Sequence, residues 1–257
     1  MMDRTEFKKF FKTPGVVILP VIHVLDFEQT ARNIMIAATE GVPGVFLINH
    51  DFPYPQLLPI VQQVRQRFPA LWFGVNFLGV TGRDAFPVLG GLSAQGVKVD
   101  AYWADDARID ECADQQKEAD DIAAIRESSG WDGLYFGGTA FKKQREVEAM
   151  KYGLSARIAS RYMDSVTTSG VATGKPAALS KIEAFRRGCG DIPLAVASGV
   201  TPDNIGDYGK VVDAILVATG INHPGDFYNI DPARLQRLIS IAHRVSISRG
   251  NEAGPGQ

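Results

Sequence analysis

The chain of 257 residues is 45% hydrophobic and 22% charged, a balance typical of a globular protein with a substantial core, which excludes a largely disordered chain. Its formal net charge is -2 and its lysines and arginines are scattered, so we expect no nucleic-acid partner. The charged N-terminal segment lacks the apolar stretch of a signal peptide, and no apolar run reaches the roughly 18 residues of a membrane span. We therefore expect a cytoplasmic protein without a transmembrane segment. Cys112 and Cys189 stand in no metal-ligand or redox spacing, and we expect free thiols.

Eight short apolar runs with β-branched residues recur along the chain, each too short for a helix. They begin at Val16, Gly44, Leu71, Val97, Gly133, Ser165, Leu194 and Ala214. Stretches of helical period lie between most of them. The clearest run from the cap Asp26 to Gly41, from Pro55 to Phe68, and from Asp231-Pro232 to Ala242.

Apolar strands that alternate with helices indicate a parallel sheet covered on its outside, and eight is the number of strands in a closed barrel. We predict a single α/β domain, a (β/α)₈ TIM barrel, over residues 1–245. A flexible tail is expected over 246–257, where Gly, Pro and polar residues gather. A doubly wound open sheet is the alternative, because strand periodicity does not report closure.

Catalytic side chains of a parallel barrel stand at the C-terminal ends of its strands. This rule selects His23, Asp51, Asn76 and Lys142 as catalytic candidates. It also selects Asp105 and Asp106, which we expect to form a solvated, helix-capping loop pair. His23 would act as general acid or base with Asp51 to orient it, since an imidazole titrates near neutral pH. Asn76 would hydrogen-bond a substrate oxygen, and Lys142 would form a Schiff base or hold an anionic intermediate; a buried structural Asn and a solvated Lys are the alternatives.

Two glycine turns follow the seventh and eighth predicted strands, where this fold commonly binds phosphate on free backbone amides. Together with the end of the sixth strand they supply the predicted phosphate contacts, which are Thr168, Gly170, Ser198, Gly199, Thr219 and Gly220. The alternative is that the glycines only make tight turns. We therefore expect the barrel to be similar in fold to those that bind ribulose phosphate.

Four local patterns run through this framework. The first is a His at the end of the first strand, and the second is an Asp-x-Pro-aromatic sequence after the second strand. The third is Gly-x-Asn-x-Leu in the third strand. The fourth is an Asp before the sixth strand together with Gly-x-x-Thr-Gly after that strand. The positions are His23, Asp51, Pro53, Tyr54, Gly74, Asn76, Leu78, Asp164, Gly170, Thr173 and Gly174. In these residues the chain resembles the BtpA family from the first strand to the last helix. The resemblance implies a (β/α)₈ barrel and these site positions.

The chain also departs from the family pattern. An Asn-Asp pair after the third-strand Asn and an Arg on the fourth strand are absent, and the family's Lys-His step is matched at Lys142 only. We therefore expect a divergent member. One branch of the family is associated with photosystem I assembly at thylakoid membranes, and other members are treated as enzymes without an agreed reaction.

We expect an enzyme that acts on a small phosphorylated sugar or nucleotide-like metabolite by acid–base chemistry, as an isomerase, lyase or hydrolase. A non-catalytic assembly or biogenesis factor and a phosphometabolite sensor are the alternatives. No cofactor is required by the sequence. A divalent metal at His23, His50 and Asp51 remains open, as does a homo-oligomer.

Overall fold

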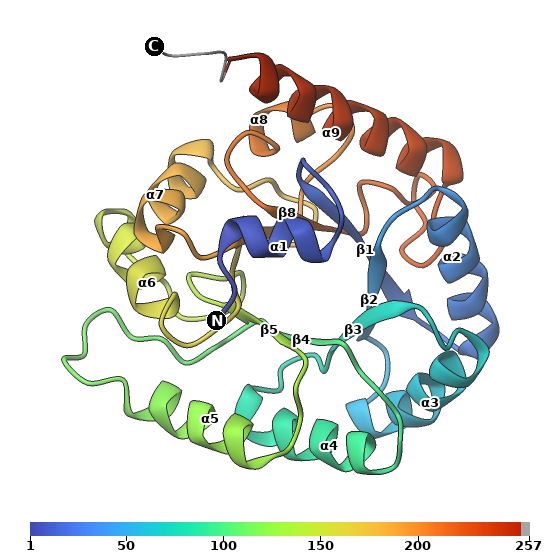
Figure 1. Ribbon diagram of the computed structural model, residues 1–257, viewed down its shortest axis with the longest axis horizontal. Helices are drawn as coiled ribbons and strands as arrows, with labels where there is room; N and C mark the ends of the chain where they lie inside the picture. The colour runs from blue at the N-terminus through green and yellow to red at the C-terminus, as the bar shows by residue number, and fades with distance from the viewer. Residues whose placement is uncertain (253–257) are drawn as a thin grey trace.

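The computed structural model describes residues 1–252, with side chains described as far as residue 245. Eight parallel strands pair in chain order and β8 pairs with β1, so the sheet closes into a barrel (Figure 1). The strands are β1 Val17–Val24, β2 Gly44–Asn49, β3 Trp72–Asn76, β4 Ala101–Ala104, β5 Leu134–Gly138, β6 Ser165–Ser169, β7 Leu194–Ala197 and β8 Ala214–Val217. This confirms the predicted barrel and excludes the open sheet.

Helices cover the outside of the barrel (Figure 1). They are α2 Phe27–Thr39, α3 Leu57–Arg67, α4 Gly82–Ala94, α5 Lys117–Ser128, α6 Tyr152–Ala159, α7 Leu179–Cys189, α8 Ile205–Tyr208 and α9 Pro232–Glu252, with 3₁₀ turns η1 Tyr54–Gln56 and η2 Ala149–Lys151. The Asp26 carboxylate caps α2 as predicted, accepting the amide of Gln29 at 2.7 Å. Helix α9 extends past the predicted boundary at residue 245, and the end of the expected tail, 253–257, lies outside the described residues.

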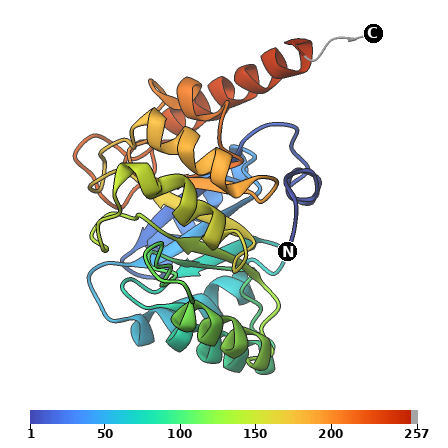
Figure 2. The same ribbon diagram turned by 90° about the vertical axis from the view of Figure 1, so that its left-hand side faces the viewer.

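A further helix, α1 Arg4–Phe10, closes the N-terminal end of the barrel (Figure 2). Its Asp3–Glu6 capping box satisfies the first amides. Phe7 and the following Phe11 are buried and pack on the inward-facing side chains of the strands, among them Phe46 and Phe136. A second apolar layer lies between the barrel and its helices. Among the described residues, α1 therefore covers the N-terminal end of the barrel interior, which leaves the opposite end as the place to look for a ligand site.

A buried ion pair recurs three times at the N-terminal end of the barrel. In each case an Asp immediately before an even-numbered strand accepts a backbone amide near the start of the preceding strand and pairs with an Arg at the end of a covering helix. The pairs are Asp100–Arg65, Asp164–Arg126 and Asp213–Arg186, with N···O distances of 2.7, 2.5 and 2.7 Å. These aspartates hold strands and helices in register, so their role is structural.

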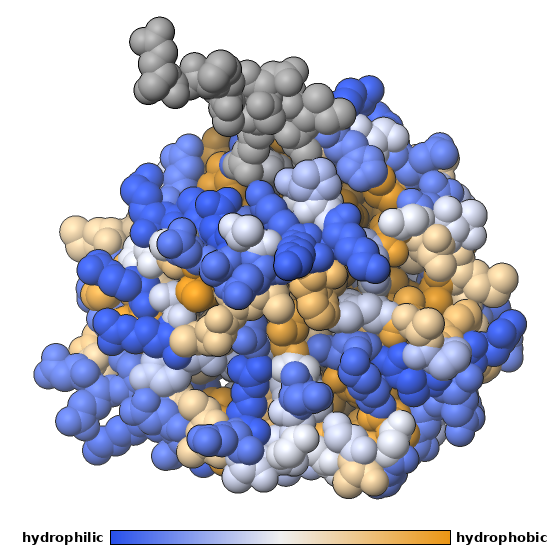
Figure 3. Space-filling view, viewed as in Figure 1, coloured by the Kyte–Doolittle hydropathy of each residue, from blue (hydrophilic) through white to orange (hydrophobic). Residues whose placement is uncertain are grey.

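The outer surface is mixed in polarity. On the face that carries α1, hydrophilic side chains separate the hydrophobic ones (Figure 3). The most exposed large apolar side chains are Val171 and Met150, at 87% and 84%. None of the helices in the described part of the chain has the length and apolar character needed to span a bilayer.

Candidate functional site

A cavity lies at the C-terminal mouth of the barrel, and each strand or the loop after it contributes to its lining. The sequence-selected residues among the lining are His23, Lys142, Ser198 and Thr219. His50, Trp103, Asp105, Lys143, Thr173 and Gly174 complete the polar part of the wall. Side chains from β1, β5, β7 and β8 therefore meet at one place, as the strand-end rule requires.

His23 is held rigidly at this mouth. Its Nδ1–H donates to the Phe227 carbonyl oxygen at 2.8 Å, and its ring stacks on the Phe227 ring at a centroid distance of 3.8 Å. The carbonyl can only accept, so Nε2 carries the free lone pair. Burial, followed by repulsion from His50, lowers the pKa of His23 to about 4. His23 is therefore neutral at physiological pH and a weak base.

This buried histidine makes the fold sensitive to acid. Between pH 6.5 and about 4 the unfolded chain binds a proton at residue 23 that the folded chain excludes, so stability present above pH 6.5 is lost as the pH falls. The difference is about 3 kcal/mol. The side-chain amide of the His23→Asn variant still offers an N–H to the Phe227 carbonyl but does not titrate. Between pH 6.5 and pH 4 we therefore expect this variant to lose about 3 kcal/mol less unfolding free energy than the wild type loses.

Urea unfolding at pH 6.5 and pH 4 measures this difference. The exposed imidazole of His243 on α9 supplies the matched control, His243→Asn, which should follow the wild type. If the unfolding free energies of His23→Asn and the wild type fall in parallel with pH, burial does not lower the pKa of His23.

Asp51 lies at the rim and is exposed. It accepts a hydrogen bond from the Tyr228 hydroxyl at 2.9 Å, and within the described chain it makes no hydrogen bond to His23, on which it acts through its charge alone. The segment that carries Tyr228 is fixed from α2, because the side-chain amides of Gln29 and Asn33 both donate to the Tyr228 carbonyl. The segment between β8 and α9, rather than Asp51, therefore orients His23.

Asn76 is fully buried at the end of β3 and does not line the mouth cavity. Its Nδ2 donates to Asp105 Oδ1 at 3.0 Å, while its own Oδ1 has no protein partner. Asp105 follows β4 and is 9% exposed. Asn76 thus reaches the site through Asp105.

Lys142 crosses the mouth from the loop after β5. Its Nζ donates to Ser198 Oγ at 2.6 Å, and its backbone amide donates to Ser169 Oγ at 2.8 Å. Burial lowers the pKa of Lys142, and the nearby Asp105 carboxylate opposes that shift. Ser198 has a φ of +75°, a left-handed conformation that is strained for a non-glycine residue, which is typical of functional loops. The ammonium group therefore lies directly at the loop after β7.

The predicted glycines pack the loops against each other. A Cβ on Gly199 would lie 2.3 Å from Lys175 C and Pro176 N, and one on Gly220 would lie 1.9 Å from the Val200 carbonyl oxygen. The loops can approach this closely only because both residues lack a Cβ: the loop after β7 contacts the loop after β6 at Gly199, and the loop after β8 contacts the loop after β7 at Gly220. Gly170 allows the loop after β6 to fold back on itself, because a Cβ there would lie 2.3 Å from the Lys175 carbonyl oxygen of the same loop.

Backbone donors remain beside these contacts. Within the described chain the amides of Gly199, Thr219 and Gly220 make no hydrogen bond. Thr168 lies elsewhere, because alternation along β6 turns its side chain outward, where Oγ1 donates to the Ala140 carbonyl at 3.4 Å. The inward-facing Ser169 takes the position at the mouth.

Metal-ligating residues converge at one place in the described chain, away from the two mouth histidines. The group is Asp110, Glu111 and Cys112. Arg145 hydrogen-bonds Glu111, and Lys151 Nζ lies 3.3 Å from Cys112 Sγ, so cations of the protein already occupy this group. The donors therefore fit an ion-paired surface cluster better than a metal.

The strand-end rule selected Asp105 but predicted a solvated loop residue, whereas the structure buries it; Phe227 was not singled out at all. Asp105 had a signal, since it continues the inward alternation of Ala101 and Trp103 on β4. Phe227 had none, because its backbone carbonyl meets a ring 204 positions earlier in the chain.

The model of the BtpA family matches residues 118–244 of the chain. An uncharacterized protein of Thermococcus kodakarensis is 23% identical over 85% of this chain and 86% of its own length. The photosystem I biogenesis protein BtpA of a Synechocystis strain is 22% identical over 82% of this chain and 78% of its own. Among solved structures, the tryptophan synthase alpha subunit of Legionella pneumophila aligns over 96% of this chain and 100% of its own, with a TM-score of 0.61 and 14% identity. That likeness concerns the fold alone.

Proposed function

Since the chain is a divergent member of the BtpA family folded as a closed parallel barrel, we propose that it is a cytoplasmic enzyme acting on a small phosphorylated sugar or nucleotide-like metabolite. The phosphate lies between the Lys142 ammonium, the hydroxyls of Ser198 and Thr219, and the amides of Gly199 and Gly220. The reaction is acid–base chemistry on the rest of the molecule, as an isomerase, lyase or hydrolase.

The contact between Lys142 and Ser198 carries the proposal. It places a half-buried ammonium at the loop after β7, whose Gly199 amide has no acceptor within the described chain. A cation and free amides together form an anion site, and these loops are where barrels of this type commonly bind phosphate. A phosphate group there would be fixed at one end while the remainder of the substrate faces His23 and Asp105.

We expect Lys142→Met to weaken the binding of inorganic phosphate and of sugar phosphates about 10- to 100-fold, because a charge-assisted hydrogen bond contributes about 1.5–3 kcal/mol. Thermal-shift titration with inorganic phosphate, a panel of sugar phosphates and nucleotides measures the change by mass action. Lys210→Met, at an exposed lysine between α8 and the start of β8 and therefore at the N-terminal end of the barrel, is the matched control and should bind like the wild type. Equal shifts for Lys142→Met and the wild type refute the phosphate site, and a wild type that no anion stabilises refutes the proposed function.

The name of the Synechocystis relative supports a second candidate, a role in biogenesis without catalysis. Exposed apolar side chains such as Met150 and Val171 are the feature of this chain that favours it. Turnover of any panel member decides for the enzyme, whereas tight binding without turnover decides for a sensor of the same ligand.

A further inference from the structure

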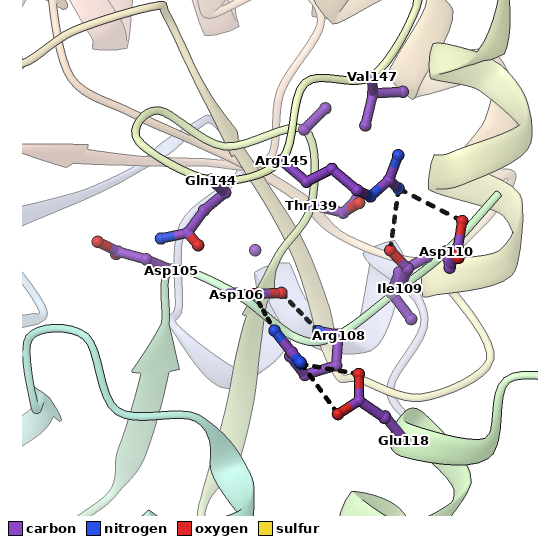
Figure 4. Close-up of a pocket in the computed structure, with 12 residues that line it drawn as sticks. Asp105, Asp106, Arg108, Ile109, Asp110, Glu118, Thr139, Gln144, Arg145 and Val147 are labelled. Carbon is purple, nitrogen blue, oxygen red and sulfur yellow. Dashed lines mark hydrogen bonds and ion pairs between the residues drawn. The ribbon is translucent and has the colours of Figure 1, made fainter. Parts of the chain in front are cut away.

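Several carboxylates in the loop after β4 and at the start of α5 are paired with arginine. Asp106 and Glu118 both bind Arg108, and Asp110 binds Arg145 at 3.7 Å (Figure 4). Figure 4 shows Asp105 pointing away from this network, with no interaction to the other residues drawn. Asp105 forms no ion pair with any residue that the structure describes.

The Asp105 carboxyl group is fixed on one side and open on the other. Its Oδ1 accepts the Nδ2–H of the fully buried Asn76, while no hydrogen bond within the described chain engages Oδ2. The residue lines both the mouth cavity and the neighbouring cavity between the loops after β4 and β5. A carboxyl with one oxygen held and the other facing a cavity is arranged for proton transfer.

The other titratable groups at the mouth are less suited to this role. His23 has its Nδ1–H committed to a carbonyl and a pKa of about 4, and burial also lowers the pKa of His50. The Lys142 ammonium is bound to Ser198. Burial raises the pKa of Asp105 above its ordinary value, while the Asn76 hydrogen bond, Lys142 and Lys143 limit the rise.

We propose that Asp105 is the general acid–base group of this site and that Asn76 is its positioning residue. This inference rests on the proposed function and replaces His23 in that role. Oδ2 takes a proton from an O–H or C–H group of the bound substrate, whose bonding electron pair stays on the substrate. The same proton returns to another substrate atom when the product forms, so no external oxidant or cofactor is needed for the step.

Turnover of the sugar phosphate that the wild type converts is the first test. We expect Asp105→Asn to lower kcat by about 100-fold or more, the scale of general acid–base catalysis, without weaker substrate binding. Asp106→Asn is the matched control, an adjacent carboxyl already paired with Arg108, and should retain kcat. Asn76→Ala should move the limb of the kcat–pH profile that reports Asp105 to higher pH, because it removes the hydrogen bond that favours the carboxylate. A kcat in Asp105→Asn equal to the wild type's overturns the inference.

Sulfate binding tests the Asp105 carboxyl without turnover, because sulfate keeps the same charge from acid to neutral pH. Wild-type affinity should rise as the pH falls and Asp105 loses its charge opposite Lys142, and Asp105→Asn should bind sulfate more tightly near pH 8 with a flatter pH curve. His23, His50, Lys143 and Asp106 also face this region, but they are unchanged in the variant, so the difference between the curves isolates Asp105.

Each remaining outcome decides between the two proposals. Identical sulfate curves overturn the role of Asp105 and leave the phosphate site standing. A wild type that binds sulfate but converts no member of the panel overturns catalysis by Asp105. A wild type that binds neither sulfate nor phosphate overturns the proposed function itself.

Discussion

Asp213→Ala is expected to lower the free energy of unfolding by about 3–5 kcal/mol, the scale for removing one partner of a buried ion pair. The Asp213 side chain is completely buried and accepts three bonds, from Arg4 Nε at 2.9 Å, Arg186 Nη1 at 2.7 Å and the Leu194 amide at 3.0 Å. Alanine leaves two guanidinium groups without their carboxylate and frees the starts of β7 and β8. Urea denaturation monitored by tryptophan fluorescence measures the loss.

The control is Asp203→Ala, which removes the exposed pair with Arg237. The side chains of this pair are 75% and 63% exposed, so its loss should cost less than about 1 kcal/mol. Asp100→Ala and Asp164→Ala should resemble Asp213→Ala, since they occupy the equivalent buried pairs. A loss below about 1 kcal/mol at Asp213 contradicts the structural role of the repeated pair.

Gly199→Ala should destabilise the protein by about 2–5 kcal/mol and weaken phosphate binding at least about 10-fold. Two penalties combine: a φ of +73° is strained for any residue with a Cβ, and that Cβ would lie 2.3 Å from the backbone of Lys175 and Pro176. The substitution therefore separates the loops after β6 and β7 that bring Ser198 to the mouth. Chemical unfolding and thermal-shift titration with inorganic phosphate measure both effects.

Gly41→Ala isolates the strain from the clash. Gly41 has a φ of +76°, but a Cβ added there would meet no atom within 4 Å, so this variant should lose about 1 kcal/mol and bind phosphate normally. If the two variants lose equal stability, the close approach of the loops at Gly199 contributes nothing.

The strands and most of the covering helices were predictable from the sequence because their signals are local. Each apolar run became a strand within a few residues of its predicted start, and the Asp26 and Asp231 caps stand at the starts of α2 and α9. Helix α1 was not predicted, although the Asp3–Glu6 capping box was a readable signal. The repeated Asp–Arg pair was also missed, since the pairs join residues 27 to 38 positions apart and no short repeat encodes them.

The sequence alone determined the fold class and the end of the barrel at which chemistry is expected, because strand periodicity and chain order impose both. Tertiary structure decided which polar side chains meet there: it buried Asp105 beside Asn76, left Asp51 at the rim, and turned Thr168 away from the mouth. The physical reason is that a side chain's burial and partners depend on loops from distant strands, as when the Phe227 carbonyl fixes the proton of His23. Local propensity contains no information about such contacts.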